Sequence, residues 1–251
     1  MQVTVLGKSP SWQDADGACS GYLVEEAGSL VLLDCGNGVF AKLRRYADYR
    51  AVGALVITHL HADHFLDLVP FSYALLYGPS EQQAVRPVLH APAGARETFR
   101  RIVGAWGKED LIESAFDLRE YQPDDVLEIG PLHVRFQVVP HFTQTHAVEF
   151  SAGGGRFTYG ADHGPSEELI AFAHGTDVLL LEATLPEPEP EGPRGHITPG
   201  EAGEHGRRAE ARRLVITHVS DMLDPDWVRA EAERGFGGPV DLAHEGATYS
   251  I

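Results

Sequence analysis

Four potential metal ligands lie within six residues of this sequence, directly after a short apolar run at residues 54–57. They are His59, His61, Asp63 and His64. Imidazole and carboxylate groups at this density are typical of a zinc site. An extended segment that turns into a loop and a helix can project the first two histidines one way and the following Asp-His pair another. One short segment can therefore serve two neighbouring metal ions, which constrains the fold around it.

Length and composition indicate one large domain over residues 1–251, because 43% of the chain is hydrophobic and no Ser/Gly-rich linker divides it. No apolar run approaches the roughly 20 residues that cross a bilayer. Residues 1–6 are typical of a strand and lack the basic region of a signal peptide, so we expect a cytoplasmic protein. The two cysteines, Cys19 and Cys35, do not suggest a disulfide framework.

The net charge is −17, from 37 acidic and 20 basic residues. Proteins that bind a nucleic-acid backbone normally use clustered Lys and Arg, so this balance disfavours long nucleic acid as a partner. A small-molecule substrate fits the composition better. Bound cations neutralise charge only locally, so the total does not give the sign of the potential at the site.

Runs of β-forming residues occur in two parts of the chain, with helical segments after each. Strands are expected at residues 3–6, 21–24, 29–34, 54–57 and 88–90, then at 126–129, 132–139, 147–151, 156–159, 178–182, 214–216 and 240–242. Helices are expected at residues 39–46, 65–77, 93–103, 167–173, from 199 onward and at 225–233, while 108–125 is ambiguous. Thr198, Pro199 and Glu201 give the strongest helix start, with a hydroxyl cap, a first-turn proline and an acid three residues after the cap. Two strand-rich halves predict an α/β fold in which two sheets pack face to face with helices outside.

Three further candidate ligands stand at predicted strand ends, where a rigid scaffold presents functional groups. His141 follows the strand at 132–139, Asp162 follows the strand at 156–159, and His218 follows the strand at 214–216. The sequence Ile-Thr-His occurs at residues 57–59 and again at 216–218. This repetition suggests equivalent strand ends in the two halves.

In order and context, these motifs resemble those of the metallo-β-lactamase superfamily, and the resemblance covers essentially the whole chain. It implies an αββα sandwich of two packed mixed sheets, with two divalent metal ions at one edge, usually zinc, with manganese as the alternative. By motif position, His59, His61 and His141 would hold one metal, and Asp63, His64 and His218 the other, with Asp162 bridging the pair. Asp34 would orient a ligand histidine without binding metal.

Residues 179–184 and 195–202 resemble the ribonuclease Z and small phosphodiesterase branch of that superfamily. In that branch, the glutamate at Glu182 orients the histidine at His196, which stabilises charge or donates a proton to the leaving group. Ribonuclease Z commonly carries a long arm that grips transfer RNA between the third and fourth motifs. Here His141 and Asp162 are only 21 residues apart, so no such arm fits.

Two histidines beside the motifs have open roles. His146 lies five residues after His141 and is an alternative ligand, but we prefer His141 because family members place the ligand directly after the strand. His163 follows the bridging aspartate, where the family more usually has a small residue, so it lines the pocket or adds a ligand. The loop at 186–193, rich in Pro and Glu, is expected to be an exposed connector.

We therefore expect a hydrolase in which a hydroxide bridging two zinc ions attacks a phosphodiester in a small, nucleotide-like substrate, assisted by Asp63, Glu182 and His196. Three alternatives stay open: hydrolysis of a carboxylic ester, thioester or lactone on the same fold, a ribonuclease Z-like RNA endonuclease, and a non-catalytic metal-binding module. The resemblance also suggests a homodimer.

Overall fold

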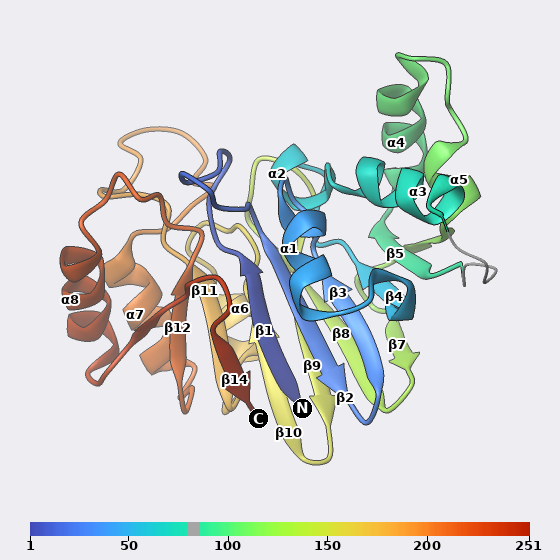
Figure 1. The fold of residues 1–251 in the computed structure, drawn as a ribbon. Helices are drawn as coiled ribbons and strands as arrows, with labels where there is room; N and C mark the ends of the chain where they lie inside the picture. The colour runs from blue at the N-terminus through green and yellow to red at the C-terminus, as the bar shows by residue number, and fades with distance from the viewer. Residues whose placement is uncertain (80–85) are drawn as a thin grey trace.

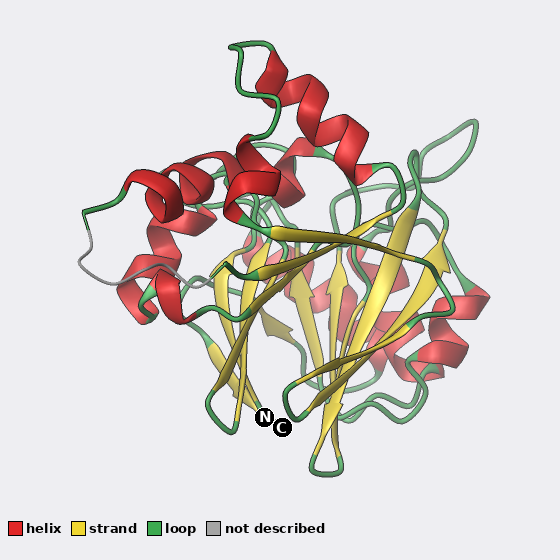
Figure 2. Ribbon diagram, turned by 90° about the vertical axis from the view of Figure 1, so that its right-hand side faces the viewer, coloured by secondary structure: helices red, strands yellow, loops and turns green. Residues whose placement is uncertain are grey.

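Two seven-stranded mixed β-sheets pack face to face, and helices cover the outer face of each (Figure 1; Figure 2). The computed structural model describes residues 1–79 and 86–251. In spatial order, the first sheet contains β14 (Thr248–Ser250), β1 (Gln2–Gly7), β2 (Gly21–Glu26), β3 (Ser29–Leu33), β4 (Ala54–Val56), β5 (Val88–Pro92) and β6 (Asp117–Tyr121). The second contains β13 (Asp241–Leu242), β12 (Leu214–Thr217), β11 (Val178–Glu182), β10 (Gly155–Tyr159), β9 (Thr145–Ala152), β8 (Leu132–Val139) and β7 (Val126–Ile129). The predicted αββα sandwich is confirmed.

The central strands are continuous apolar runs because both of their faces are covered. Strands β3 to β6 pair in parallel in one sheet, and β10 to β13 do so in the other. In β11, Val178 and Leu180 belong to the core between the sheets, whereas Leu179 and Leu181 pack against the outer helices. Parallel strands that are buried on both faces show this near-unbroken apolar pattern.

Each outer face has its own apolar layer. On the first sheet this layer includes α1 (Val39–Tyr46), α3 (Leu68–Tyr77), α4 (Ala95–Gly104) and α5 (Leu111–Ala115). On the second it includes α6 (Glu167–Phe172), α7 (Pro199–Arg208) and α8 (Pro225–Phe236). None of the helices in the described residues is long and apolar enough to span a membrane.

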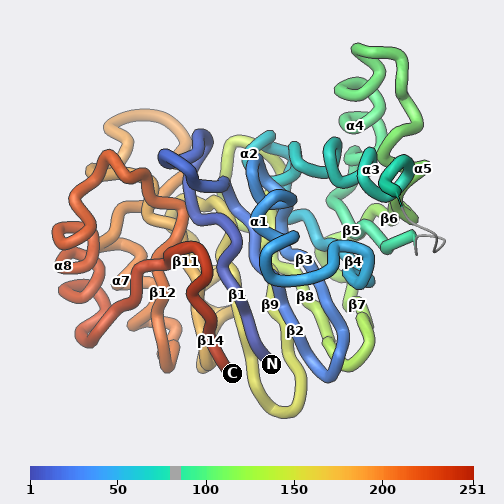
Figure 3. The backbone as a smooth tube through the Cα atoms, viewed as in Figure 1, coloured from blue at the N-terminus to red at the C-terminus, as the bar shows by residue number. Residues whose placement is uncertain are grey.

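Three segments differ from the sequence prediction. The helix expected at 65–77 is divided into α2 (Ala62–Phe65) and α3, because Asp67 between them donates its N–H to the Cys35 carbonyl and accepts the Phe40 N–H. The ambiguous stretch at 108–125 contains α5 and β6. Strand β14 was not predicted; it pairs antiparallel with β1 and brings the two chain ends together, where the Met1 amine donates to the Ile251 carbonyl at 3.0 Å (Figure 3).

The candidate residues lie at one edge of the sandwich. They follow the ends of β3, β4, β8, β10, β11 and β12, whose directions bring these ends to the same side. Asp34 and His218 both have left-handed backbone, with φ of 55° and 53°. Such sharp turns directly after a strand are uncommon for residues other than glycine, and here both side chains are fully buried.

Candidate metal centre

The loop after β4 divides its four candidate ligands by local conformation. His61 has extended backbone and is the N-cap of α2, and its carbonyl accepts the His64 N–H at 3.0 Å. His59 and His61 therefore leave the chain from an extended segment, whereas Asp63 and His64 leave it from a helical turn. All four residues lie within six positions of the sequence. Because the backbone changes from extended to helical between them, their side chains point to two different places and form parts of two groups.

The first group consists of His59, His61, His141 and Asp162. One potential ligand atom of each lies within 4.8 Å of the others. Nδ1 of His61 is 3.0 Å from Nε2 of His141. Oδ2 of Asp162 is 3.9 Å from Nε2 of His59 and 4.0 Å from Nε2 of His141. Four nitrogen and oxygen atoms thus surround one position.

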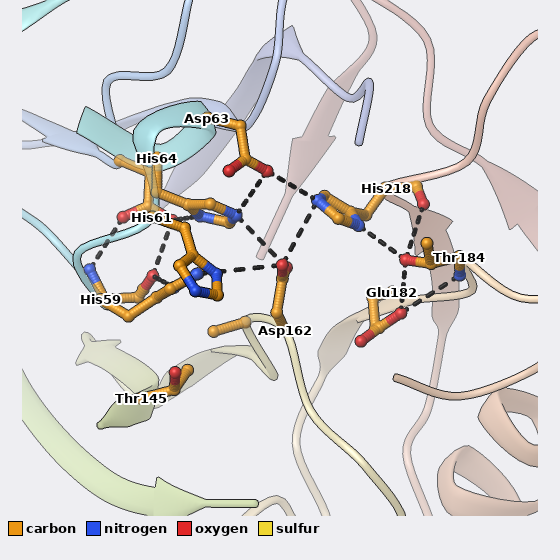
Figure 4. Close-up of polar contacts among 12 residues, drawn as sticks. His59, His61, Asp63, His64, Thr145, Asp162, Glu182, Thr184 and His218 are labelled. Carbon is orange, nitrogen blue, oxygen red and sulfur yellow. Dashed lines mark hydrogen bonds and ion pairs between the residues drawn. The ribbon is translucent and has the colours of Figure 1, made fainter. Parts of the chain in front are cut away.

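The second group consists of Asp63, His64, Asp162 and His218, all buried (Figure 4). Oδ2 of Asp63 lies 3.4 Å from Nε2 of His64 and 3.3 Å from Nε2 of His218. Asp162 completes it, with Oδ1 3.3 Å from Nε2 of His64 and Oδ2 3.4 Å from Nε2 of His218. Asp162 belongs to both groups, so its carboxylate lies between them.

Several buried atoms in these groups have no hydrogen-bond partner, namely Nε2 of His59, Nε2 of His64 and Oδ1 of Asp162. The last two are 3.3 Å apart but are not aligned as a hydrogen bond. A buried polar atom without a partner is costly and calls for a missing ligand. Imidazole nitrogen and carboxylate oxygen are common ligands of divalent zinc, so the residues present fit such ions.

The two carboxylates are ionised. Burial alone would raise the pKa of Asp63, but the hydrogen bond from His218 and the charge of His64 hold it well below the usual range. Burial acts in the same direction on Asp162, and the charges of His218 and His64 likewise hold its pKa far below the ordinary value. The centre between the groups therefore carries negative charge.

The imidazoles of the first group are neutral. Burial lowers the pKa of His59, His61 and His141, so each has a lone pair available at neutral pH. His64 behaves differently: burial alone would lower its pKa, but the carboxylates of Asp162 and Asp34 raise it well above the ordinary value. The carboxylates around His64 thus favour a positive charge beside them. A protonated imidazole supplies that charge, and a bound metal cation would supply it as well.

Asp34 and Thr58 contact two of the candidate ligand histidines, His64 and His59, from behind. Asp34 accepts hydrogen bonds from Nδ1 of His64 at 2.7 Å, from the Thr58 N–H at 2.8 Å and from the Thr58 hydroxyl at 2.9 Å. The Thr58 Oγ1 is also 3.1 Å from Nδ1 of His59. These contacts engage Nδ1 of both histidines and leave Nε2 toward the two groups.

His141 and His218 are held in the same way by groups distant in sequence. Nδ1 of His141 donates to the Gly195 carbonyl at 2.7 Å. Nδ1 of His218 donates to Oγ1 of Thr184 at 2.7 Å, and that hydroxyl in turn donates to Oε2 of Glu182 at 2.6 Å (Figure 4). The ring orientation of His218 therefore depends on a hydroxyl and a carboxylate one strand away.

Glu182 also holds His196. Oε1 of Glu182 accepts from Nδ1 of His196 at 2.8 Å. Burial would lower the pKa of His196, but the hydrogen bond and the charge of Glu182 raise it to about 9. The His196 ring lies 5.0 Å from the ring of His141 and 5.8 Å from that of His218. A protonated imidazole therefore stands beside both ligand groups.

Arg194 connects the segment before α7 to its surroundings and donates to the His196 carbonyl at 3.4 Å. Arg194 makes two hydrogen bonds to Glu201, at 2.6 and 2.8 Å, and a longer contact to Glu189 at 3.3 Å. Glu201 also takes part in the predicted capping box with Thr198, which the structure confirms. The acidic loop at 186–193, mostly exposed, is thus tied to the start of α7 by one arginine.

The two ambiguous histidines lie outside the ligand groups found among the described residues. His146 is buried, with Nδ1 3.3 Å from the Tyr121 hydroxyl and 3.4 Å from the Thr58 carbonyl. His163 donates its backbone N–H to Oε1 of Glu182 at 2.8 Å, while its Nδ1 donates to the Ala161 carbonyl at 3.1 Å. His163 thus supports Glu182 through its backbone.

Sequence reasoning missed three residues at the site: Thr58, Thr184 and Gly195. Each contributes through one hydroxyl or carbonyl that contacts a ligand histidine. The only local signal was position, since Thr58 directly precedes His59 and Thr184 ends the segment containing Glu182. A backbone carbonyl such as that of Gly195 has no sequence signature.

The fold and the site define the class of protein. The chain belongs to the β-lactamase superfamily, since the model of the β-lactamase superfamily domain matches residues 30–219. Membership in this family supports a metal-dependent hydrolase, and the two His/Asp groups support binding of divalent metal.

Similar proteins cover the chain from end to end. An uncharacterised protein of Mycobacterium leprae is 31% identical over 265 aligned residues, covering 100% of this chain and 89% of the relative. YhfI of Bacillus subtilis, named a probable metallo-hydrolase, is 29% identical and covers 99% of both chains. A ribonuclease Z of Natronomonas pharaonis is 27% identical over 301 aligned residues, covering 100% of this chain and 98% of the relative. That alignment exceeds the 251 residues present here, so the ribonuclease has segments without a counterpart in this chain.

Solved structures show the same fold. The crystal structure of YhfI from Bacillus subtilis matches with a TM-score of 0.86 and 26% identity, covering 99% of this chain and 98% of that one. A diphosphatase of the PhnP family matches with a TM-score of 0.76 and 22% identity, covering 100% and 97%. At that identity, the second match is evidence for the fold alone.

Proposed function

We propose that this chain is a dinuclear metal-dependent phosphodiesterase that acts on a small, nucleotide-like substrate. The observation that carries the proposal is the position of the Glu182–His196 pair beside the two ligand groups. With a pKa of about 9, His196 is protonated at neutral pH. A site with bound cations and a protonated imidazole suits a substrate whose reacting group is anionic, because both stabilise negative charge. The imidazole can also donate a proton to the oxygen of the leaving group.

The name of one similar protein, a ribonuclease Z that is 27% identical, supports phosphoester chemistry. We propose zinc as the native metal, with manganese as the alternative. The ligands of one ion would be His59, His61 and His141, those of the other Asp63, His64 and His218, with Asp162 shared. When bound, two such ions stabilise charge on phosphoryl oxygens and make water ionise near neutral pH.

Three side chains of the protein then act on the substrate and the attacking water. Asp63 is ionised and accepts a hydrogen bond from the water. This hydrogen bond orients the water molecule, and the Asp63 carboxylate can accept the proton that the water loses. His196 donates the proton on Nε2 to the leaving oxygen, because its Nδ1 is engaged by Glu182. Glu182 keeps that imidazole charged and in a fixed orientation.

The chain between the third and fourth motifs supports a small substrate. Strands β9 (Thr145–Ala152) and β10 (Gly155–Tyr159) and the short turn between them fill most of the segment from His141 to Asp162, so no RNA-gripping arm extends from it. The net charge of −17 also disfavours a polyanionic partner. Both features favour a small phosphodiester over transfer RNA.

The direct test is hydrolysis of bis-p-nitrophenyl phosphate by the purified protein loaded with Zn²⁺ or Mn²⁺. We expect His61→Ala to lower the rate to background. The matched control is His133→Ala, because His133 lies on β8, is exposed and pairs with Glu128 outside the site. Unchanged hydrolysis by His61→Ala would contradict the metal-dependent mechanism.

Parallel assays separate the alternatives. A lactone or thioester cleaved faster than any phosphodiester would favour carbonyl chemistry, and cleavage of a transfer-RNA precursor would favour a ribonuclease. Bound metal without hydrolysis of any substrate would favour a binding module. A cytoplasmic location also remains a proposal. A homodimer is a proposal from resemblance, and light scattering of the purified protein tests it.

A further inference from the structure

A cavity of about 380 Å³ lies at the end of β12, and the residue that directly follows this strand, His218, belongs to the second ligand group. Part of its wall is formed by Val219 and Ser220, the two residues that follow His218. Lys8, after β1, also lines it and donates to the Val219 carbonyl at 2.8 Å. The loops after β1 and β12 therefore meet at the same edge of the sandwich as the ligand groups (Figure 3).

The cavity wall is largely apolar. It includes Ile216, Val219, Leu223, Leu242 and Ala243. The volume falls within the range of roughly 300–1,000 Å³ that is usual for small-molecule sites. Binding an organic ring against an apolar wall of this size is favourable because the ring is removed from water. An inorganic anion would lose its hydration there without a compensating contact.

The rim of the cavity carries basic groups. Lys8, Arg229 and His244 line it together with one acid, Asp221. Arg229 contacts Asp226 at 3.5 Å, one helical turn away and exposed, and such pairs contribute little. The Arg229 guanidinium can therefore turn to a ligand with acceptor atoms. Lys8 is already paired with Asp14, so Arg229 is the group in this wall that favours a ligand with acceptor atoms.

The larger hollow along α4 does not offer the same chemistry. Its volume is about 540 Å³, and apart from Gly94 it is lined only by arginine and glutamate side chains. A ring placed there would meet no apolar wall. The cavity after β12 combines apolar walls with an exposed arginine, and its wall begins at the residue that follows the candidate ligand His218.

We propose that this cavity binds the base of the nucleotide-like substrate while the phosphodiester lies at the ligand groups; this inference rests on the proposed function. A nucleobase has apolar faces and acceptor atoms on its edge, which match the Leu223 side of the wall and the Arg229 side of the rim. Consecutive Cα atoms are about 3.8 Å apart, so the wall at Val219 and Ser220 begins within about 8 Å of His218. That separation suits one substrate with its phosphate and base at the two places.

The test compares two esters with the same leaving group, the p-nitrophenyl ester of thymidine 5′-monophosphate and bis-p-nitrophenyl phosphate, which lacks a base. The readout is the ratio of their kcat/KM values. We expect Leu223→Trp, which fills the cavity, to lower this ratio about tenfold or more. Arg229→Ala should also lower it about tenfold or more, as the loss of one charge-assisted hydrogen bond would. Arg234→Ala, an exposed arginine on the same helix, is the matched control and keeps the wild-type ratio.

Calorimetric titration with adenosine, guanosine, cytidine and thymidine gives a readout without catalysis. Nucleoside binding that Leu223→Trp abolishes supports the cavity, even if the wild type cleaves neither ester and the proposed function fails. Cleavage of both esters, with the ratio and nucleoside binding unaffected in folded Leu223→Trp and Arg229→Ala, overturns the inference while the proposed function stands. Thermal melting of each variant establishes that it is folded.

Discussion

The Thr184 hydroxyl connects His218 to Glu182, and removing it tests how the site holds metal. It accepts from Nδ1 of His218 at 2.7 Å and donates to Glu182 at 2.6 Å. Thr184→Val keeps the shape of the side chain but leaves the buried His218 Nδ1 without its acceptor. An unsatisfied buried donor costs about 1–3 kcal/mol. Loss of such an outer contact typically weakens metal binding about 10–100-fold, which agrees with that energy.

The assay is a competition titration of Zn²⁺ between the metal-free protein and a chromogenic chelator. We expect two binding phases, one for each of the two ligand groups that share Asp162. Thr184→Val should weaken only the phase that involves His218, by about 10–100-fold, and leave the phase of the His59, His61 and His141 group near its wild-type value. Thr184→Ser is the matched control, because it retains the hydroxyl and should bind as the wild type does.

Two results would refute this reasoning. Equal Zn²⁺ affinity of Thr184→Val and wild type would show that His218 keeps its orientation without the hydroxyl. An equal loss in Thr184→Ser and Thr184→Val would show that the methyl group, through packing, controls the site. Circular dichroism of the metal-free variants separates both results from a loss of folding.

Two further predictions concern pH. In Glu182→Gln, no carboxylate opposes the effect of burial, so the pKa of His196 falls from about 9. Phosphodiesterase activity of the variant should then decline with rising pH already near neutrality, whereas that of the wild type declines only near pH 9. An unchanged alkaline decline in the variant would contradict the role of Glu182. Burial lowers the pKa of His90 from 6.5 to about 4, so between these pH values the unfolded chain binds more protons than the folded chain. His90 therefore lowers the free energy of unfolding as the pH falls through this window, by at most about 3 kcal/mol before solvent screening. Urea unfolding at several pH values should therefore show a weaker acid loss in His90→Gln than in the wild type.

The sequence predicts the framework of the site because its ligands follow strands that are themselves visible as apolar runs. His141, Asp162 and His218 each come shortly after a predicted strand, and the strands that precede them are β8, β10 and β12. These strands run in the same direction, so their ends lie at one edge of the sheet. The apolar runs predict the strands, and the usual topology of such folds predicts their direction. The prediction of a layered α/β fold succeeded for the same reason.

The contacts that orient the ligands depend on the folded chain and are not visible in sequence. Gly195 lies 54 residues from His141, and Thr184 lies 34 residues from His218. Any carbonyl or hydroxyl could serve, so nothing in the local pattern identifies these two. Strand β14 was missed because only Tyr249 of its three residues is buried, which leaves no apolar run to recognise.

Backbone conformation at the strand ends shows how the fold supports the site at some cost in stability. Of the six non-glycine residues with positive φ in the described chain, Asp34, Ala161 and His218 lie at or directly before candidate site residues. Each such turn costs roughly 1–3 kcal/mol and persists only where its surroundings determine it. Glycine would relieve that strain, but it would remove the Asp34 carboxylate that holds His64 from behind, or the His218 imidazole of the second ligand group. The sequence therefore keeps the side chain at these turns, and the surrounding hydrogen bonds, such as those of Asp34 with His64 and Thr58, offset the strained backbone.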